Sequence, residues 1–367
     1  MKKSIALILT IVLAVSALAG CAGTTVVVGE CTCPVEHLEQ VPVEVESIPA
    51  ATDDTLISVG AAKTGLAVIP SVSKSVSATA EAAGAAEYDV TVVAVTVNDE
   101  GVIQSCAIDS IPATVNFDTT GTITTDLTAP VQTKNEKGEN YGMVAWGGAI
   151  AEWDQQVAAL ARYAEGKTVE QLKNGDIDMT TGMAKDGTDL KSSATIYLGG
   201  YVSAIEAAVN NAQHLGAETA DELILTTMNS LGSSTSADAE NAGNAQLDAD
   251  IVALTRKNGI ITSCYIDSLQ AKIAFDTTGT ITTDLTAPIQ TKNELGENYG
   301  MVAWGGAIAE WNQQAASFAQ YITGKTAADV AGIAIEPSTK PAEGTDLRNS
   351  VTISIGGFQA LIAKALQ

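Results

Sequence analysis

The segment FDTTGTITTDLTAP occupies residues Phe117–Pro130 and recurs, letter for letter, as Phe275–Pro288. Further downstream, the strings KNE and GENYGMVAW also appear twice, at the same offset of 158 residues. A repeat of this length has the size of a whole domain, whereas solenoid repeats are several times shorter. The sequence therefore predicts two tandem homologous domains, at about residues 55–213 and 214–367.

Each copy contains short β-branched runs separated by turn residues, a pattern typical of antiparallel strands. In the first copy, Val90–Val97 and Val102–Ile108 are joined by a turn, and Ala113–Phe117 leads into the shared Thr-Thr-Gly turn. The second copy has the corresponding runs Ile251–Thr255 and Ile260–Ile266. These runs predict an antiparallel meander in each domain.

An apolar stripe with steps of four and three residues follows the strands of each copy, and it predicts an amphipathic helix packed on the sheet. A last helix is expected at about Gly200–Asn210, and again at about Gly357–Leu366. Antiparallel strands covered by helices make each domain α+β. The stripe consists of Trp146, Ile150, Trp153, Val157, Leu160 and Ala164, and of Trp304, Ile308, Trp311, Ala315, Phe318 and Ile322 in the second copy.

Two motifs that would indicate enzymatic chemistry are incomplete. The tripeptide Gly-Lys-Thr at 166–168 and 324–326 lacks the earlier glycine of a phosphate-binding loop, because Ala161 stands in that place. We interpret both tripeptides as helix stops and exclude binding of nucleoside triphosphates. The two histidines, His37 and His214, are not equivalent in the repeat, which argues against a histidine-dependent triad in either domain.

The N-terminus has the pattern of a bacterial lipoprotein signal. Lys2 and Lys3 precede an apolar run, which ends in Leu18-Ala19-Gly20-Cys21 and resembles a lipobox. This resemblance implies that residues 1–20 are a signal peptide and that lipid on Cys21 anchors the protein outside the cytoplasm. An ordinary secretory peptide and an uncleaved anchor are the alternatives. Residues 21–54, with their prolines and glutamates, are expected to form an extended tether.

The composition excludes some partners. A formal net charge of −24 leaves no basic patch for nucleic acid. Cys31 and Cys33, with His37 nearby, hint at a metal or redox site, but a fourth ligand is missing, so we predict no metal centre. Cys106 and Cys264 occupy equivalent repeat positions and are expected to be small buried residues without a disulfide.

A heptapeptide that begins with Asp and ends with Thr occurs once in each copy: DLKSSAT at Asp189–Thr195, and DLRNSVT at Asp346–Thr352. Both resemble the Asp-x-x-Ser-Gly-Ala-Thr signature of the bacterial FMN-binding domain family. In that family, a dedicated flavin transferase esterifies the last threonine to the phosphate of FMN. The resemblance implies that Thr195 and Thr352 carry covalent FMN, and that the leading aspartate belongs to the sequence which the transferase reads.

The residues of the first heptapeptide suit such an attachment. Thr195 supplies the hydroxyl, and the short side chains of Ser192, Ser193 and Ala194 would let a phosphate approach the backbone. The helix expected to begin near Gly199-Gly200 would present unpaired N–H groups to an anion. An alternative interpretation is that the Ser and Thr residues only cap this helix.

Both heptapeptides depart from the signature. Ser193 and Ser350 replace its glycine, so a positive φ at either position would be disfavoured. Asn349 replaces Ser or Thr, and Val351 replaces Ala and is expected to add bulk beside the acceptor Thr352. The spacing from Asp to Thr is nevertheless the same in both copies, which capping alone does not explain.

The flavin ring requires a slot with aromatic or thioether side chains. The segment that the two copies share most closely supplies candidates, which pack at a helix start in the alternative interpretation. They are Tyr141, Met143 and Trp146, with Tyr299, Met301 and Trp304 in the second copy.

The resemblance implies a lipid-anchored extracytoplasmic electron carrier, not a self-contained enzyme. It would receive electrons from a membrane quinol or dehydrogenase and pass them to an extracellular acceptor such as ferric iron or a soluble reductase. The alternative is a cofactor-free surface lipoprotein with a binding or structural role that retains the fold. An adhesin or surface antigen is a third interpretation, based only on the anchor and the duplication.

Overall fold

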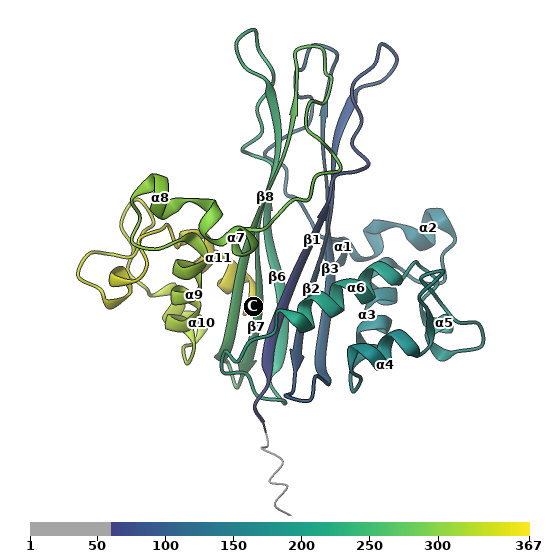
Figure 1. Cartoon of the computed structure of the whole chain (residues 1–367), viewed down its shortest axis with the longest axis vertical. Helices are drawn as coiled ribbons and strands as arrows, with labels where there is room; N and C mark the ends of the chain where they lie inside the picture. Colours follow the sequence, from purple (N-terminus) through teal and green to yellow (C-terminus); the bar gives the residue numbers. More distant parts are fainter. Residues whose placement is uncertain (1–59) are drawn as a thin grey trace, which may run out of the picture. The chain divides into compact units, whose positions relative to one another are not determined.

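Each repeat forms one three-stranded antiparallel sheet, and the two sheets stand side by side in the middle of Figure 1. The computed structural model describes residues 60–367. Consecutive strands pair in both sheets, so the predicted meander is confirmed. The strands are β1 (Lys63–Ser71), β2 (Gly84–Val97) and β3 (Ile103–Phe117) in repeat 1, and β6 (Glu222–Ser230), β7 (Gly243–Lys257) and β8 (Ile260–Phe275) in repeat 2.

The strands are longer than the sequence indicates. The runs Val102–Ile108 and Ala113–Phe117, expected to be separate strands, belong to the single strand β3. Pro112 does not interrupt β3, because β3 lies at the edge of its sheet, where a missing N–H need not remove a ladder hydrogen bond. The first strand of each repeat, β1 or β6, was not predicted.

The two repeats share one apolar core between their sheets, which we call the inter-sheet core. Buried residues of both repeats contribute to it, and at its centre the rings of Phe117 and Phe275 stack with centroids 4.1 Å apart. The described residues 60–367 accordingly belong to one compact unit. The boundary expected at residues 213 and 214 therefore separates two structural repeats that are packed together across this core.

The identical segments Phe117–Pro130 and Phe275–Pro288 join the repeats beyond the inter-sheet core. The backbone N–H of Ala78 donates to the carbonyl of Gly279 (2.8 Å), and Ala237 donates to Gly121 in the same way (2.8 Å). A pseudo-two-fold contact of this kind requires the same surface twice. Each copy of the segment therefore makes the same backbone contact with the other repeat.

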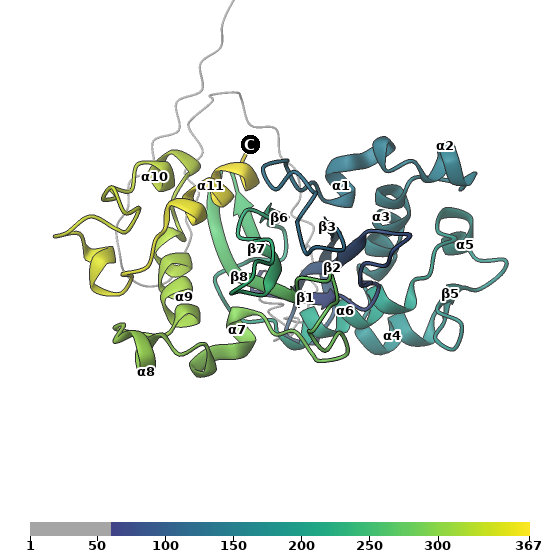
Figure 2. The same cartoon turned by 90° about the horizontal axis from the view of Figure 1, so that it is seen from above.

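The helices cover the outer faces of the sheets, as the view from above shows (Figure 2). In each repeat they enclose a second apolar cluster with the sheet, which we call the helix-side core. The helices confirm the α+β class. Repeat 1 contains α1 (Lys134–Lys137), η1 (Gly138–Tyr141), α2 (Met143–Gly147), α3 (Trp153–Ala164), α4 (Val169–Asn174), α5 (Asp189–Ser193) and α6 (Gly199–Asn210), with the ribbon β4 (Ile177–Asp178) and β5 (Met183–Ala184). Repeat 2 contains α7 (Lys292–Leu295), η2 (Gly296–Tyr299), α8 (Met301–Gly305), α9 (Trp311–Ile322), α10 (Ala327–Ala331), η3 (Asp346–Asn349) and α11 (Gly356–Ala365).

The helix predicted to begin at Trp146 begins instead at Trp153, as α3. Trp146 belongs to the short helix α2, which ends at Gly147 and is followed by Gly148 in the left-handed conformation (φ 62°). Its side chain is 84% exposed, so it is not part of the core. Repeat 2 behaves identically, with Trp304 on α8. The predicted C-terminal helices are confirmed as α6 and α11.

Some of the remaining sequence predictions concern residues that the structure describes, and others do not. Each Gly-Lys-Thr tripeptide follows α3 or α9 and precedes a new helix that Thr168 or Thr326 caps, so both are helix stops. Cys106 and Cys264 carry no disulfide. Between residues 60 and 367, no helix is long and apolar enough to cross a membrane. The signal peptide, Cys21, the tether, Cys31, Cys33 and His37 lie outside the described residues.

Candidate functional site

The heptapeptide of each repeat begins with one helical turn. In repeat 1 the turn is α5, and Ala194 after it is extended (φ −143°, ψ 117°). In repeat 2 the turn is η3, and Ser350 after it has φ −118° and ψ −14°. Thr195 and Thr352 come shortly after these turns, and both are half-buried. The end of each heptapeptide therefore lies at the surface with a partly accessible hydroxyl.

A buried glutamine holds each of these threonines. Gln156, which projects from α3 and is 0% exposed, accepts hydrogen bonds at Oε1 from Thr195 N (2.8 Å), Thr195 Oγ1 (3.3 Å) and Ile196 N (3.2 Å). Its Nε2 donates to the carbonyl of Ala151 (2.8 Å). Both ends of the amide are thus fixed, and the threonine backbone is positioned through two N–H groups as well as through the hydroxyl.

Repeat 2 reproduces this arrangement on α9. Gln314 Oε1 accepts from Thr352 N (2.7 Å), Thr352 Oγ1 (3.2 Å) and Ile353 N (3.2 Å), and its Nε2 donates to Ala309 O (2.8 Å). The heptapeptides differ at three of the four positions between Asp346-Leu347 and Thr352, but the contacts to the threonine do not. We call each pair, Gln156 with Thr195 and Gln314 with Thr352, a glutamine clamp.

A buried glutamate lies one helical turn before each clamp glutamine. Glu152 accepts from the backbone N–H groups of Met143 (2.8 Å) and Val144 (2.9 Å), and so fixes the start of α2. Glu310 does the same for α8 in repeat 2. Residues four apart on a helix lie on one face, roughly 5–6 Å from each other. The turn that carries Trp146 and the hydroxyl of Thr195 are therefore anchored at neighbouring positions on α3.

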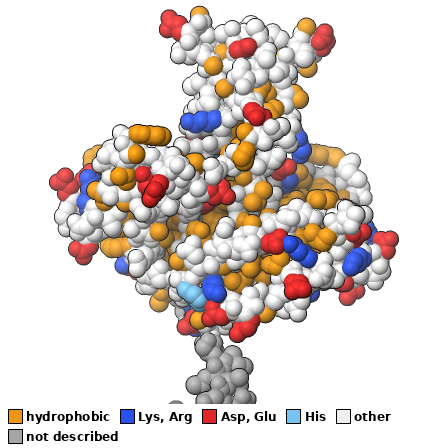
Figure 3. Space-filling model, in the orientation of Figure 1, with side chains coloured by type: hydrophobic (Ala, Val, Ile, Leu, Met, Phe, Trp, Pro, Cys, Tyr) orange, Lys and Arg blue, Asp and Glu red, His pale blue; other side chains and the backbone are white. Residues whose placement is uncertain are grey.

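The three ring-slot candidates of each repeat lie in different environments. Tyr141 and Met143 are half-buried and pack on the helix-side core. The ammonium group of Lys134 lies 5.5 Å from the Tyr141 ring centroid and 5.0 Å from that of Trp153. Tyr299, Met301 and Lys292 repeat this pattern. Of the three candidates in each repeat, only Trp146 or Trp304 is largely exposed. Figure 3 shows hydrophobic side chains gathered on the surface over α8.

Trp146 is held in place although it is exposed. Its indole lies over Gly142, where a Cβ atom would come within 2.6 Å of the ring. Gly142 also has a positive φ of 82°, a conformation that glycine adopts without strain. Repeat 2 has the same packing between Trp304 and Gly300. Each repeat thus presents an exposed aromatic face in a fixed orientation.

At Ser193 and Ser350, the departures from the signature cause no backbone strain in this structure. Ser193 lies inside α5, and Ser350 has a φ of −118°, so neither needs the positive φ that glycine favours. The side chains of Ala194 and Val351 are fully buried in the helix-side cores. Val351 therefore points away from the surface, and the expectation that its bulk crowds Thr352 was wrong.

The remaining residues of the heptapeptides have local roles. Thr188 caps α5, and the exposed Ser192 and Ser193 donate to the carbonyls of Thr188 and Asp189. Asp189 and Asp346 are the first residues of α5 and η3.

The helix-capping interpretation of the heptapeptide is wrong. The residue at the N-cap of α6 is Leu198, without a side-chain cap, and Thr195 bonds to Gln156 instead. The expected anion site at the start of α6 is also partly occupied, because the N–H groups of Leu198 and Gly199 both donate to the carbonyl of Gly182 (2.6 and 3.1 Å). An anion on Thr195 would therefore not meet a fully free helix terminus.

One difference between the repeats lies beside the clamps. In repeat 1 the ring of Tyr197 covers Gly182, where a Cβ atom would come within 2.0 Å of it. In repeat 2 the equivalent residues are Ser354 and Thr339, whose hydroxyls bond to each other. Thr339 keeps the positive φ (59°), which is uncommon for a β-branched residue. Tyr197 is largely exposed, so repeat 1 has a second aromatic residue near its clamp that repeat 2 lacks.

A lysine lies beneath the ring-slot segment of repeat 1. Lys134 is 8% exposed, and its Nζ lies 3.7 Å from Asp89 Oδ1. Burial opposes ionisation of Asp89, but Lys134, the Ser110 hydroxyl and Lys74 together hold its pKa below the usual value. Lys134 is therefore paired with a carboxylate in this region. Within residues 60–367, no cluster of three or more His, Cys, Asp or Glu side chains is arranged to hold a metal ion.

The sequence analysis did not identify the clamp glutamines or the supporting glutamates. The available signal was the string AEW-x-QQ, which occurs at 151–156 and 309–314 and places polar residues within the apolar stripe. Comparison of the chain with protein-family models, curated proteins and solved structures gave no match. The candidate site is therefore described from its own geometry.

Proposed function

We propose that the protein is a lipid-anchored extracytoplasmic lipoprotein that carries covalent FMN on Thr195 and Thr352 for electron transfer. The glutamine clamp supports this proposal most strongly, because it is present in both repeats at the threonine that the family signature names. Further support comes from the glutamates, which fix the start of the short helix with the exposed tryptophan and lie four residues before each clamp glutamine. Neither arrangement is needed to cap α6 or α11.

The residues present fit a threonine-linked flavin phosphate. In the proposed transfer, the flavin transferase would cleave the phosphoanhydride of a flavin dinucleotide donor, form the Oγ1–P bond on Thr195, and release the nucleotide together with the hydroxyl proton, so Oγ1 would no longer donate to Gln156. The N–H groups of Thr195 and Ile196 keep their bonds to the same oxygen, and the backbone stays in place. Trp146 offers a face for an aromatic ring, which stacking favours. When bound, FMN would supply the electron-transfer chemistry, and this chain would set its position and exposure.

The proposal includes partners outside the chain. A flavin transferase would read the heptapeptide and load each threonine. A membrane quinol or dehydrogenase would donate electrons, and an extracellular compound such as ferric iron or a soluble reductase would accept them. Because α5 and η3 begin at the aspartate of each heptapeptide, a transferase reading that aspartate would contact a short exposed helical turn.

The test uses the full chain expressed in its native host. We expect Thr195→Val and Thr352→Val each to remove one covalently bound flavin, detected by flavin fluorescence of the denatured protein in a gel. Thr180→Val, an exposed threonine outside the clamps, is the matched control. Full fluorescence in the double variant would contradict the attachment sites.

The alternative, a cofactor-free surface lipoprotein, gives a different result in the same experiment. It predicts no flavin on the wild-type chain and only a small stability change for Thr195→Val. The change would be about 0.5–1.5 kcal/mol, because a single side-chain hydrogen bond is lost while the two backbone bonds remain.

A further inference from the structure

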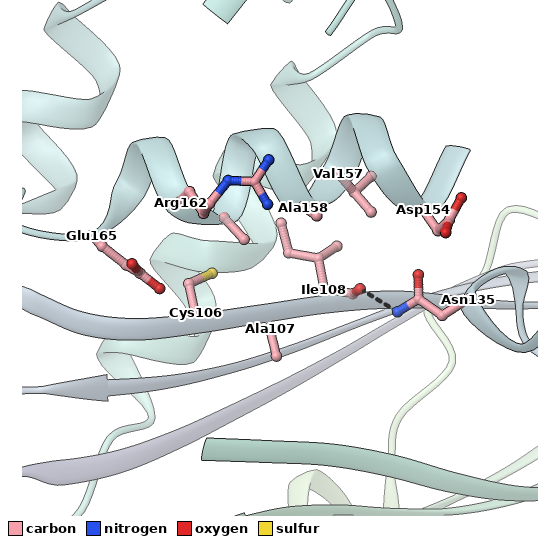
Figure 4. Close-up of a pocket in the computed structure, with 10 residues that line it drawn as sticks. Cys106, Ala107, Ile108, Asn135, Asp154, Val157, Ala158, Arg162 and Glu165 are labelled. Carbon is pink, nitrogen blue, oxygen red and sulfur yellow. Dashed lines mark hydrogen bonds between the residues drawn. The ribbon is translucent and has the colours of Figure 1, made fainter. Parts of the chain in front are cut away.

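Each repeat has a cleft between its long helix and the outer strand of its sheet. In repeat 1 the cleft lies between α3 and β3 and has a volume of about 400 Å³ (Figure 4). The equivalent cleft of repeat 2, between α9 and β8, has a volume of about 780 Å³. Small-molecule sites typically measure about 300–1,000 Å³. Thr195 and Thr352 line neither cleft, so these cavities are separate from the proposed flavin sites.

The two clefts differ in charge. In repeat 1, Asp154 and Arg162 on α3 and Glu165 just after it line the cleft, with Arg162 between the two carboxylates in Figure 4. All three are replaced by neutral side chains in repeat 2: Asn312, Gln320 and Thr323. No Asp, Glu, Lys or Arg side chain lines the α9–β8 cleft. The substitutions convert a charged cleft into a neutral polar one.

The α9–β8 cleft is rich in side chains that both donate and accept hydrogen bonds. Carboxamides offer two donors and one acceptor each, and hydroxyls offer both functions. Between them lie Ala316 and Ala319 of α9, which give the wall an apolar surface. The carboxamides are Gln213, Asn293, Asn312, Gln313 and Gln320, and the hydroxyls are those of Tyr265, Ser317 and Thr323.

The equivalent residues Asp154 and Asn312 each have a buried side-chain oxygen without a hydrogen-bond partner in the described part of the chain. Oδ1 of Asn312 has no hydrogen-bond partner among residues 60–367, and neither does Oδ1 of Asp154 in repeat 1. Figure 4 places Asp154 at one end of the repeat 1 cleft, near Asn135. A buried polar atom without a partner costs about 1–3 kcal/mol. A ligand in the cleft could recover this energy by donating a hydrogen bond to Asn312 once its carboxamide rotates toward the cleft, because Oδ1 is itself buried.

The segment that joins the two repeats gives the α9–β8 cleft a third wall. Gln213, His214 and Leu215 line it, whereas the repeat 1 cleft is lined only from β3, α1, α3 and the residue Glu165. Gln213 exchanges two backbone hydrogen bonds with Thr64 (2.9 and 3.0 Å), and its Nε2 donates to the Tyr265 hydroxyl (3.3 Å). The wall is therefore fixed before any ligand arrives, which reduces the entropy lost on binding.

We propose that the α9–β8 cleft binds a neutral, polyhydroxylated small molecule of the sugar class, and that the charged α3–β3 cleft does not. Sugar hydroxyls donate and accept, which matches the carboxamide and hydroxyl side chains that line the cleft. The C–H faces of a sugar ring suit the alanines of α9. Among the described residues, the cleft has no Lys or Arg side chain for an anionic ligand, its His214 Nε2 lies 3.1 Å from Asp99 Oδ1, and the net charge of −24 would repel such a ligand.

The test is calorimetric titration of the full chain with glucose, N-acetylglucosamine and maltose, and with glucose 6-phosphate as the anionic probe. We expect saturable binding of at least one neutral sugar and none of the phosphate. Asn312→Leu removes the unpaired oxygen, and Gln320→Arg introduces the residue of repeat 1 at an exposed position. Each should weaken binding at least tenfold. Asp154→Asn, the matched change in repeat 1, should leave the affinity unchanged.

Circular dichroism and the thermal midpoint establish that each variant is folded. Gln320 is exposed, so Gln320→Arg provides a folded variant even where Asn312→Leu destabilises α9. The proposal is overturned when none of the three neutral sugars binds, when folded Gln320→Arg binds as tightly as the wild type, or when glucose 6-phosphate binds equally well. Flavin loading does not enter this test, because neither cleft includes a clamped threonine.

Discussion

Replacing Gln156 by leucine tests the role of the glutamine clamp. Leucine has a similar size but cannot form hydrogen bonds. Thr195 N and Ile196 N therefore lose their acceptor, and the carbonyl of Ala151 loses its donor. A buried backbone group without a partner costs about 1–3 kcal/mol. Since Thr195 and Ile196 are half-buried and water reaches part of this region, we expect a total loss of about 3–5 kcal/mol in the free energy of unfolding.

The assay combines urea unfolding of the full chain with measurement of covalent flavin. Gln156→Leu should lower the urea midpoint and also the flavin loading of Thr195, because the acceptor hydroxyl is no longer held. Gln155→Leu, at the exposed neighbouring position, is the control and should change neither. A loss below about 1 kcal/mol, together with unchanged loading of Thr195, would refute the reasoning.

Three further predictions concern other parts of the molecule. Trp146→Ala should change stability by no more than about 0.5 kcal/mol because the side chain is 84% exposed, but should alter the fluorescence of the bound flavin; an unchanged fluorescence would count against ring stacking. Gly121→Ala should destabilise the protein by about 1–3 kcal/mol in thermal unfolding, because its Cβ would lie 2.6 Å from a carbonyl of the other repeat, whereas the control Gly101→Ala, with open space around it, should have a smaller effect. Burial raises the pKa of Asp267 to about 6, so between about pH 4 and pH 6 the folded chain binds more protons than the unfolded chain and stability falls as pH rises. Asp267→Asn should remove up to about 3 kcal/mol of this pH dependence, measured as urea midpoints across that window, and an unaltered slope would contradict the assignment.

Much of the fold follows from local sequence pattern. The β-branched runs identify β2, β3, β7 and β8, and the spacing of apolar residues identifies most of α3 and α9. The start of α3 was placed wrongly because Trp146 and Ile150 continue the helical spacing although both are exposed. Periodicity reports which residues share a helix face, but it cannot show that Gly147 and Gly148 end one helix before another begins.

The relation between the repeats was less accessible to sequence analysis. The identity of Phe117–Pro130 with Phe275–Pro288 establishes a duplication, but it does not show that the two segments contact each other. The stack of Phe117 on Phe275 places a shared core where two separate domains were expected. Contacts between residues that are 158 positions apart depend on the packing of both sheets, and no local pattern encodes them.

The sequence likewise indicated one part of the candidate site and not the other. The heptapeptides, with Thr195 and Thr352 as predicted flavin acceptors, were singled out by their resemblance to a family signature. The clamp glutamine Gln156 lies on α3, 39 residues before Thr195. In the sequence it was only a polar residue within an apolar stripe. Its role becomes visible only when the extended residues after α5 are packed against α3.

The central claim is tested most directly by intact-mass analysis of the mature protein from its native host, followed by peptide mapping. We predict a mass increment of one FMN phosphoester for each loaded repeat, located on the peptides that contain Thr195 and Thr352. An unmodified mass for these peptides, in a host that contains the flavin transferase, would contradict the account and leave a cofactor-free surface lipoprotein.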